Sequence, residues 1–424
     1  MDPISKPGDV AVIDWTIESR MICDLNEWRD KFEEVQEFVA SPDGQTIAAL
    51  VKTGEDEITP CVNGEVWEDT FEKAWSLRFG PDGRLFCLVM NDDEWTVAED
   101  GRRWDETFDY VWNLCISPDG RGVAANVRTS DGYSAVVNGQ PWETKFVEAR
   151  NCMISKDGTK AAIAVQLSPL AEGDIFEFRK GLWSLAFDGD VWGKNFLNVW
   201  GFDINCDGTS TAAEVRLDPT TQSIAVDGEP WLPGYKAVWQ PLFVPNSKSV
   251  IAPALTSGGW QLLMDGKPLW NRTFNQVWHQ KFAPDAKTIA AVISPEFGRW
   301  TIAVEGKPWK TTFGDVVLAP VFSPDSKNVA AAVKDKGRWM VAVNGVVWNQ
   351  QFDMVWDPVF TPDSTQVAVK VAIGSNQFVF VNGKKMSAGY QLLWEPIFSP
   401  EGTEMLIRCV ENGKYYRKVV PVTK

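Results

Sequence analysis

Apolar and polar residues alternate in two short runs, 339–343 and 347–352, which flank the dipeptide Asn344-Gly345. Alternation with a period of two is typical of strands, because successive side chains point to opposite faces of a sheet. Both central residues of a type I′ turn need positive φ, which asparagine and glycine tolerate. The pattern therefore predicts an antiparallel hairpin, followed by a tight turn at Pro362-Asp363.

This unit is repeated along the whole chain. The second turn has ten copies, which are Ser41-Pro42-Asp43-Gly44, Gly80-Pro81-Asp82-Gly83, Ser117-Pro118-Asp119-Gly120, Ser155-Lys156-Asp157-Gly158, Asn205-Cys206-Asp207-Gly208, Val244-Pro245-Asn246-Ser247, Ala283-Pro284-Asp285-Ala286, Ser323-Pro324-Asp325-Ser326, Thr361-Pro362-Asp363-Ser364 and Ser399-Pro400-Glu401-Gly402. Their spacing of about 38 to 40 residues, with one longer interval, matches a four-stranded propeller blade.

The hairpin dipeptide alternates with that turn. Its copies are Asn63-Gly64, Asp100-Gly101, Asn138-Gly139, Asp188-Gly189, Asp227-Gly228, Asp265-Gly266, Glu305-Gly306, Asn344-Gly345 and Asn382-Gly383. Two alternating turn types give four strands per repeat, so residues 1–424 are predicted to be one all-β propeller domain of about ten four-stranded repeats.

The two ends of the chain are predicted to close the ring. Residues 9–30 look like a strand pair, and residues 396–421 supply three strands of an unfinished last blade. A strand from one terminus that completes the blade of the other removes the open sheet edges. We therefore favour one closed ring, and two five-bladed propellers are the alternative.

Tryptophan follows the same period. A first register precedes Phe or Tyr by four residues and includes Trp28, Trp67, Trp104, Trp142, Trp192, Trp231, Trp270, Trp309 and Trp348, and a second, four residues further on, includes Trp75, Trp112, Trp200, Trp239, Trp278, Trp356 and Trp394. Aromatic side chains placed by a repeat indicate packing between blades more than a ligand-stacking surface. We assign Trp67, Trp104, Trp142, Trp192, Trp231, Trp270, Trp309 and Trp348 to the structural core of the repeats.

The one long interval places extra residues, 166–182, between the second and third strands of the fourth repeat. Repeat insertions form loops on one face, and that face often binds partners. We predict a hairpin finger whose apolar tip is exposed on an isolated ring. Its candidate docking residues are Ile175, Phe176, Phe178 and Arg179.

Charge is divided unevenly along the chain. Residues 1–212 contain 19 Lys/Arg and 39 Asp/Glu, whereas residues 213–424 contain 22 and 18. The first half should repel nucleic acid and anionic lipid and attract a basic partner, although an acidic surface that serves only solubility is the competing interpretation. The start of the chain shows no export signal, and no apolar run is long enough to cross a bilayer, so we expect no direct membrane insertion.

No catalytic, cofactor-binding or metal-binding motif is recognisable. The seven cysteines are scattered without a Cys-x-x-Cys pair, and we expect buried, reduced thiols. His279 is the one histidine, beside Trp278, and is predicted to be a packed ring. The recurring Asp of the Pro-Asp turn is interpreted as a residue that caps its own backbone. The sequence therefore indicates a protein that is not an enzyme and carries no cofactor.

The strand-Ser-Pro-Asp-Gly-strand unit resembles the blade repeat of WD-type and TolB-type propellers. More specifically, the iterated Trp-x-x-x-Phe-x-x-x-Trp with Val-Asn/Asp-Gly-x-x-Trp resembles the tryptophan-rich subunit of the transmembrane electron-transfer complex of sulfate-reducing bacteria. That resemblance implies a non-catalytic accessory subunit that binds cytochrome and iron–sulfur subunits. It also implies a cytoplasmic location, at the cytoplasmic face of the inner membrane.

Two other classes of propeller remain open. A lectin-like module would need near-identical polar residues at one place in several repeats, whereas Asn349-Gln350-Gln351 and Lys310-Thr311-Thr312 differ at equivalent positions. Quinone-dependent dehydrogenases also repeat Trp motifs, but they are usually exported and need calcium and quinone ligands. We rank a scaffold first, a carbohydrate- or ligand-binding propeller second and an enzyme third.

Overall fold

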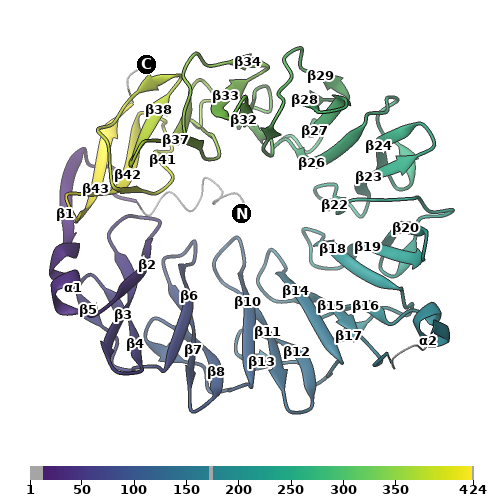
Figure 1. Cartoon of the computed structure of the whole chain (residues 1–424), viewed down its shortest axis with the longest axis horizontal. Helices are drawn as coiled ribbons and strands as arrows, with labels where there is room; N and C mark the ends of the chain where they lie inside the picture. The colour runs from purple at the N-terminus through teal and green to yellow at the C-terminus, as the bar shows by residue number, and fades with distance from the viewer. Residues whose placement is uncertain (1–12, 171–174, 423–424) are drawn as a thin grey trace.

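The structure is a computed structural model that describes residues 13–170 and 175–422. Within these residues the strands form ten antiparallel sheets, or blades, which follow one another around a single ring (Figure 1). The predicted ten-repeat propeller with one closed ring is confirmed, and the alternative of two five-bladed propellers is wrong.

The first five blades each contain four strands, named from the innermost strand outward. They are blade 1, β2 (Val35–Ala40), β3 (Ile47–Gly54), β4 (Glu57–Val62) and β5 (Glu65–Val66); blade 2, β6 (Lys73–Phe79), β7 (Leu85–Asn91), β8 (Glu94–Glu99) and β9 (Arg102–Arg103); blade 3, β10 (Tyr110–Ile116), β11 (Val123–Thr129), β12 (Gly132–Val137) and β13 (Gln140–Pro141); blade 4, β14 (Glu148–Ile154), β15 (Ala161–Gln166), β16 (Trp183–Phe187) and β17 (Asp190–Val191); and blade 5, β18 (Asn198–Ile204), β19 (Thr211–Asp218), β20 (Thr221–Val226) and β21 (Glu229–Pro230).

In the last three blades the innermost strand is split into two short pieces. The second half of the ring comprises blade 6, β22 (Leu242–Phe243), β23 (Val250–Thr256), β24 (Gly259–Met264) and β25 (Lys267–Pro268); blade 7, β26 (Gln276–Phe282), β27 (Ile289–Glu296), β28 (Arg299–Val304) and β29 (Lys307–Pro308); blade 8, β30 (Val316–Val317), β31 (Val321–Phe322), β32 (Val329–Asp335), β33 (Arg338–Val343) and β34 (Val346–Val347); blade 9, β35 (Met354–Val355), β36 (Val359–Phe360), β37 (Val367–Ile373), β38 (Asn376–Val381) and β39 (Lys384–Lys385); and blade 10, β40 (Leu392–Leu393), β41 (Ile397–Phe398), β42 (Glu404–Glu411), β43 (Lys414–Pro421) and β1 (Glu18–Asp24).

The second strand of each blade contains the most continuous apolar run. Residues Ile47 to Val51 of β3 and Leu85 to Met90 of β7 are almost wholly buried. Because each blade packs against a neighbour on both faces, this strand has no solvent side and does not alternate. Clusters of buried side chains accordingly join adjacent blades, as where Phe86 and Leu88 pack with Val111 and Val123.

The outermost strand is shorter than the predicted range 347–352. In blade 8 the ladder covers Val346 and Val347, the chain then leaves the sheet, and Phe352 returns to pair with Trp339 as an isolated bridge. The strand is interrupted where the tryptophan of the motif turns toward the next blade, and the four-residue spacing from Trp to Phe spans this excursion.

The N-terminal and C-terminal parts of the chain share blade 10. Strand β1 pairs antiparallel with β43 from Glu18–Val419 to Asp24–Lys414 (Figure 1). Of the expected strand pair over residues 9–30, the described part holds one strand and a helix, α1 (Leu25–Lys31), and residues 9–12 lie outside the described residues. Asp24 caps α1 by accepting a hydrogen bond from the Asn26 N–H, and no residue of α1 is β-branched. Both features favour a helix, so residues 25–31 form α1 instead of the predicted second strand.

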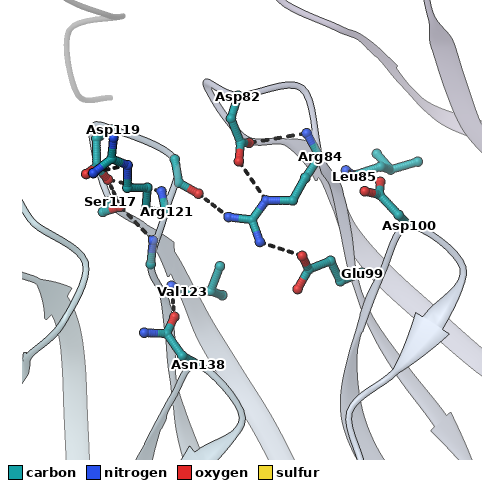
Figure 2. Close-up of polar contacts among 12 residues, drawn as sticks. Asp82, Arg84, Leu85, Glu99, Asp100, Ser117, Asp119, Arg121, Val123 and Asn138 are labelled. Carbon is teal, nitrogen blue, oxygen red and sulfur yellow. Dashed lines mark hydrogen bonds and ion pairs between the residues drawn. The ribbon is translucent and has the colours of Figure 1, made fainter.

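In blades 1–9 the first residue of the strand that follows the Pro-Asp turn is hydrogen-bonded to the hairpin turn at the same end of the blade. In blade 3, Ser117 and the backbone N–H of Arg121 donate to Asp119, and the N–H of Val123 donates to Asn138 of the hairpin turn at 2.8 Å (Figure 2). Both hydrogen bonds to the Asp119 carboxylate come from residues of its own turn. The interpretation of the recurring Asp as a turn residue is therefore confirmed.

The repeated tryptophans contact the glycine of the next blade's hairpin turn. A Cβ added at Gly101, Gly139, Gly189, Gly228, Gly266, Gly306 or Gly345 would lie 3.1 to 3.8 Å from Trp67, Trp104, Trp142, Trp192, Trp231, Trp270 or Trp309, respectively. Trp142 and Trp270 are buried and the others are half-buried. Trp348 departs from the pattern, because Gln350 occupies this position against Gly383 while Trp348 packs against the cluster shared by blades 8 and 9.

We call this contact the Trp–Gly contact. Apart from Gly383, the hairpin glycines are required for two reasons. Their φ is positive, as at Gly345 with +79°, and a tryptophan ring covers the side on which a Cβ would lie. The same contact spans the ring closure, where the Trp28 indole lies 3.6 Å from the Cβ position of Gly64. The tryptophan of one repeat therefore packs on the turn of the following repeat.

The variant Gly345→Ala should destabilise the protein by about 2 kcal/mol more than Gly337→Ala. Gly345 has a φ of +79° and Gly337 a φ of +76°. Alanine in this left-handed conformation destabilises the protein by about 1 to 2 kcal/mol at either position. Only at position 345 does the new methyl group meet Trp309, at 3.1 Å, whereas nothing lies within 4 Å of the Gly337 position. Denaturant unfolding of the two variants measures the difference, and equal losses would contradict the Trp–Gly contact.

Candidate functional site

The strand directions give the ring two unlike faces. Turns within a blade between the first and second strands and between the third and fourth lie on one face, which we call the turn face. The hairpins between the second and third strands and the loops that lead to the next blade lie on the other, which we call the hairpin face. The insertion 166–182 lies between the second and third strands of blade 4 and therefore belongs to the hairpin face, which makes this face the candidate contact surface.

Exposed apolar side chains gather on the hairpin face. Eight of the large apolar side chains that the described residues expose lie in its hairpins and loops or at the start of the inner strands: Tyr110, Val147, Leu170, Leu232, Trp239, Phe297, Val316 and Ile373. Phe297, at the tip of the hairpin of blade 7, is 96% exposed. Apolar groups that are scattered singly are ordinary, but their concentration on one face favours that face as a contact surface.

The hairpin face is acidic over blades 1–3. Its exposed carboxylates there, which we call the acidic arc, are Glu55, Asp56, Glu57, Glu72, Asp92, Asp93, Glu94, Asp109 and Asp131. Fewer cations lie among them, Lys73, Arg128 and Lys145 being examples. The uneven charge along the sequence thus becomes a local field on one face, which attracts cationic surfaces and weakens with salt.

A groove of about 560 Å³ crosses the hairpin face between blades 3 and 4. Its lining includes Asp109 and Asp131 of the acidic arc, the cations Arg128 and Lys145, and the apolar side chains Tyr133, Val147 and Leu167. The groove therefore joins the acidic arc to the insertion and combines charged side chains of both signs with apolar side chains.

The insertion 166–182 contains a short helix, α2 (Ile175–Lys180), at the outer rim of the ring (Figure 1). A hairpin finger is predicted from the sequence, whereas residues 175–180 are helical, and the run Phe176-Glu177-Phe178-Arg179-Lys180 has no β-branched residue. Residues 171–174 and the side chains of Ile175, Phe176 and Glu177 lie outside the described part. Arg179 is exposed, whereas Phe178 is half-buried rather than exposed as predicted.

The inner strands bring together side chains that sequence analysis did not single out. The residue that follows the second-register tryptophan, or its equivalent, lies on the innermost strand, just before it, or between its two pieces: Glu37, Ser76, Asn113, Asn151, Gly201, Gln240, His279, Ala319, Asp357 and Glu395. Five of these non-glycine residues, Glu37, Ser76, Asn113, Asn151 and His279, have positive φ, which marks a bulge in the strand. The signal that could have revealed this set was a polar residue directly after the repeated tryptophan.

A hollow of about 670 Å³ lies along these strands in blades 2–6. Ser76, Asn113, Asn151 and Gln240 line it, together with Arg78, Trp75, Trp112, Cys115 and Cys152. The polar groups also link neighbouring blades: Arg78 donates to the Leu114 carbonyl at 3.1 Å and Gln240 donates to the Phe202 carbonyl at 3.2 Å. Hydroxyl, amide and guanidinium groups beside indole rings can bind a neutral or weakly anionic polar ligand.

His279 belongs to the set of residues that follow the second-register tryptophans. Its ring meets Trp278 edge-on, with ring centroids 6.4 Å apart, but the side chain is exposed on the inner strand β26. The prediction of a packed ring is therefore wrong in its burial. The expectation of buried thiols is also wrong for three residues, because Cys115 and Cys152 are half-buried and Cys206 is exposed.

Among the described residues no group of three or more His, Cys, Asp or Glu side chains is arranged to hold a metal ion. No helix in the described part of the chain is long and apolar enough to span a membrane.

Glu214 is a half-buried carboxylate between blades 5 and 6. It alternates along β19 with Ala213 and shares a face with Ala212, which packs against Val238 and Val250 of blade 6. Burial raises the pKa of Glu214 to about 7. No hydrogen bond or ion pair from the described part of the chain offsets the loss of water around its carboxylate.

The variant Glu214→Gln should stabilise the protein more at high pH than at low pH. Above the unfolded-state pKa of 4.5 the unfolded chain is ionised while the folded chain stays protonated, so the penalty grows until pH passes about 7. The stability gain of the variant at pH 8.5 should exceed its gain at pH 5.5 by about 2 kcal/mol. Denaturant unfolding at both pH values measures it, with Glu57→Gln at an exposed hairpin tip as the control, and a gain independent of pH would contradict the assignment.

Comparison with known proteins adds little to this picture. No protein-family model matches the chain, and no curated protein matches it either. Among solved structures, a eukaryotic initiation factor is similar with 15% identity, a TM-score of 0.46 and coverage of 86% of this chain and 91% of that chain. TolB from Acinetobacter baumannii is similar with 16% identity, a TM-score of 0.31 and coverage of 63% and 62%. At these values neither similarity bears on function.

Proposed function

We propose that this chain is a non-catalytic scaffold that binds other proteins through its hairpin face. In the finer form of the proposal it is an accessory subunit of a membrane-associated electron-transfer complex, located in the cytoplasm or peripherally on the cytoplasmic face of the inner membrane. Its partners there are the cytochrome and iron–sulfur subunits, and it binds neither nucleic acid nor the bilayer interior.

The observation that carries the coarser proposal is the composition of the hairpin face. The acidic arc, the groove between blades 3 and 4, the insertion and the eight exposed apolar side chains all lie on this face. A surface that combines apolar contact area with a single-sign field favours a protein partner with a basic rim, because the field speeds encounter and the apolar groups slow dissociation.

The finer proposal is supported by the sequence resemblance alone. The tryptophan registers that carry the resemblance are the same residues that form the Trp–Gly contacts, so they describe how the ring is built more than what it binds. The identity of the partner is therefore a separate question from the location of the binding face, and the two need separate tests.

The first experiment is a pull-down of the tagged full chain from detergent-solubilised membranes of its native host, followed by mass spectrometry and a visible spectrum. Haem-containing and iron–sulfur subunits in the eluate would support the electron-transfer role. Capture of one defined soluble partner instead would retain the scaffold and reject the electron-transfer complex.

A shortened insertion gives this pull-down a matched variant. The flanking strands are paired at Gln166–Trp183, and the Leu167 N–H donates to the Leu182 carbonyl at 2.8 Å. Replacement of residues 168–181 by Asn-Gly should therefore close a tight hairpin like those of the other blades and leave the fold intact. Capture of the partner should fall at least several-fold, and unchanged capture would remove the insertion from the binding surface.

Neutralising the hairpin tip of blade 2 should weaken partner binding. The triple variant Asp92→Asn, Asp93→Asn, Glu94→Gln keeps side-chain shape, and asparagine tolerates the positive φ of positions 92 and 93. The association rate should fall about tenfold at low salt and lose part of its salt dependence, since the change removes steering charge. Surface plasmon resonance against the captured partner at two ionic strengths measures both quantities.

The control for this variant is Glu65→Gln, Asp190→Asn, Glu401→Gln, which removes the same charge from exposed positions on the turn face. It should leave the association rate nearly unchanged. If both triple variants slow association equally, net charge and not the acidic arc is responsible.

A second candidate function is that of a carbohydrate- or ligand-binding propeller. The observation that favours it is the hollow of blades 2–6, where Ser76, Asn113, Asn151 and Gln240 occupy one equivalent position beside Trp75 and Trp112. Quenching or enhancement of tryptophan fluorescence by a neutral oligosaccharide, lost in Asn113→Ala, would support it.

A further inference from the structure

Two cysteines are in contact at the hollow of blades 2–6. Cys115 on β10 and Cys152 on β14 belong to the inner strands of blades 3 and 4 and are both half-buried. The Cys115 thiol donates a hydrogen bond to the Cys152 carbonyl at 2.9 Å, and the two side chains interact directly. Residues that are far apart in the sequence by the length of one repeat thus place two sulfur atoms side by side.

The pair borders the hollow on the inner strands. Cys115 and Cys152 both line the hollow of about 670 Å³, with Asn113 and Asn151 directly beside them. The other thiols differ in their surroundings: Cys23, Cys61, Cys87 and Cys409 are buried, and Cys206 is exposed on the turn face near Asn246. The pair is therefore the one place in the described chain where two half-buried cysteines are in contact.

We propose that Cys115 and Cys152 are a redox-sensitive modification site, which a hydroperoxide converts reversibly into a disulfide that joins blades 3 and 4. One thiolate attacks the peroxide oxygen, which breaks the O–O bond, forms a sulfenic acid and releases water or an alcohol. The second thiol then attacks the sulfenic sulfur, the S–S bond forms, and the hydroxyl leaves as water. The peroxide gains two electrons, and each sulfur atom loses one.

The surroundings of the two thiols set the order and rate of these steps. The contact with Cys115, together with burial, raises the pKa of Cys152 well above its ordinary value. Cys115 is accordingly the first nucleophile, and Cys152 resolves the sulfenic acid. Because the thiolate is the attacking species, oxidation should be faster at pH 9 than at pH 7.

The disulfide would act on the fold at the hollow. It would close a covalent loop the length of one repeat between inner strands that are otherwise joined by hydrogen bonds and packing, which restricts the unfolded chain. The bond would also fix the wall of the hollow on which Asn113 and Asn151 lie. The proposal concerns this chain alone and does not depend on the proposed partner.

The test uses the full chain with Cys206→Ser, so that its exposed thiol cannot link two molecules. The reduced protein is treated with hydrogen peroxide at pH 7 and pH 9, unfolded, alkylated with N-ethylmaleimide and measured by intact mass and peptide mapping. We expect the loss of two alkylated thiols, a peptide that links Cys115 to Cys152, faster formation at pH 9, and full recovery after dithiothreitol. The oxidised form should melt about 3 °C higher than the reduced form.

Single variants Cys115→Ser and Cys152→Ser separate the pair from general oxidation. Each should abolish the linked peptide and the rise in melting temperature. The proposal is overturned if both thiols remain alkylated after peroxide treatment, if they are oxidised to sulfinic or sulfonic acids without linking, or if a linked peptide involves other cysteines. Peptide mapping of the chain that keeps both thiols decides the question even if a serine variant folds poorly.

Discussion

The ring depends on the contact between the tryptophan of one blade and the turn glycine of the next. Seven consecutive junctions, from Trp67–Gly101 to Trp309–Gly345, repeat it, and Trp28–Gly64 carries it across the closure. The indole needs a surface without a Cβ, and the type I′ turn needs a residue with positive φ, so glycine meets both demands at one position. Because the tryptophan of one blade packs on the turn glycine of the next, the tryptophan motif and the hairpin-turn motif recur with the same period.

That constraint leaves the two faces of the ring with different freedom. On the turn face, residues such as Asp119 and Asn138 hydrogen-bond the backbone of their own blade, and Arg84 binds Asp82, Glu99 and the Gly120 carbonyl of the next blade (Figure 2). On the hairpin face the hairpins are also hydrogen-bonded to the neighbouring loops, as where Asp353 accepts from the Gly374 N–H, but the loop composition changes from carboxylates in blades 1–3 to exposed apolar groups elsewhere. We therefore expect partner binding on the hairpin face, where the residues differ most from one repeat to the next.

The sequence predicts what the repeat dictates and misses what departs from it. The turns, the blade count and the single ring follow from periodic residues such as Gly345 and Asp363, because the same local physics acts ten times. The extent of the outer strand was wrong because Trp348 and its equivalents leave the sheet to meet a neighbour that no local pattern contains. Helix α2 was missed because an insertion occurs once and has no periodic copies to compare.

The hollow of blades 2–6 shows a second limit of prediction from the sequence. Asn113, Asn151 and Gln240 look unrelated in the sequence, and the contact between Cys115 and Cys152 arises only when the ring places inner strands side by side. Such sites depend on the spacing between blades, which the period alone does not give.

The claim that the hairpin face is the binding surface is tested most directly by hydrogen–deuterium exchange of the free chain and of the chain in its isolated complex. The account predicts new protection in the hairpins and connecting loops of blades 1–4, including residues 91–94 and 129–132, with the turn face unchanged. Protection confined to the turn face, around Asp43, Asp82 and Asp119, would contradict it.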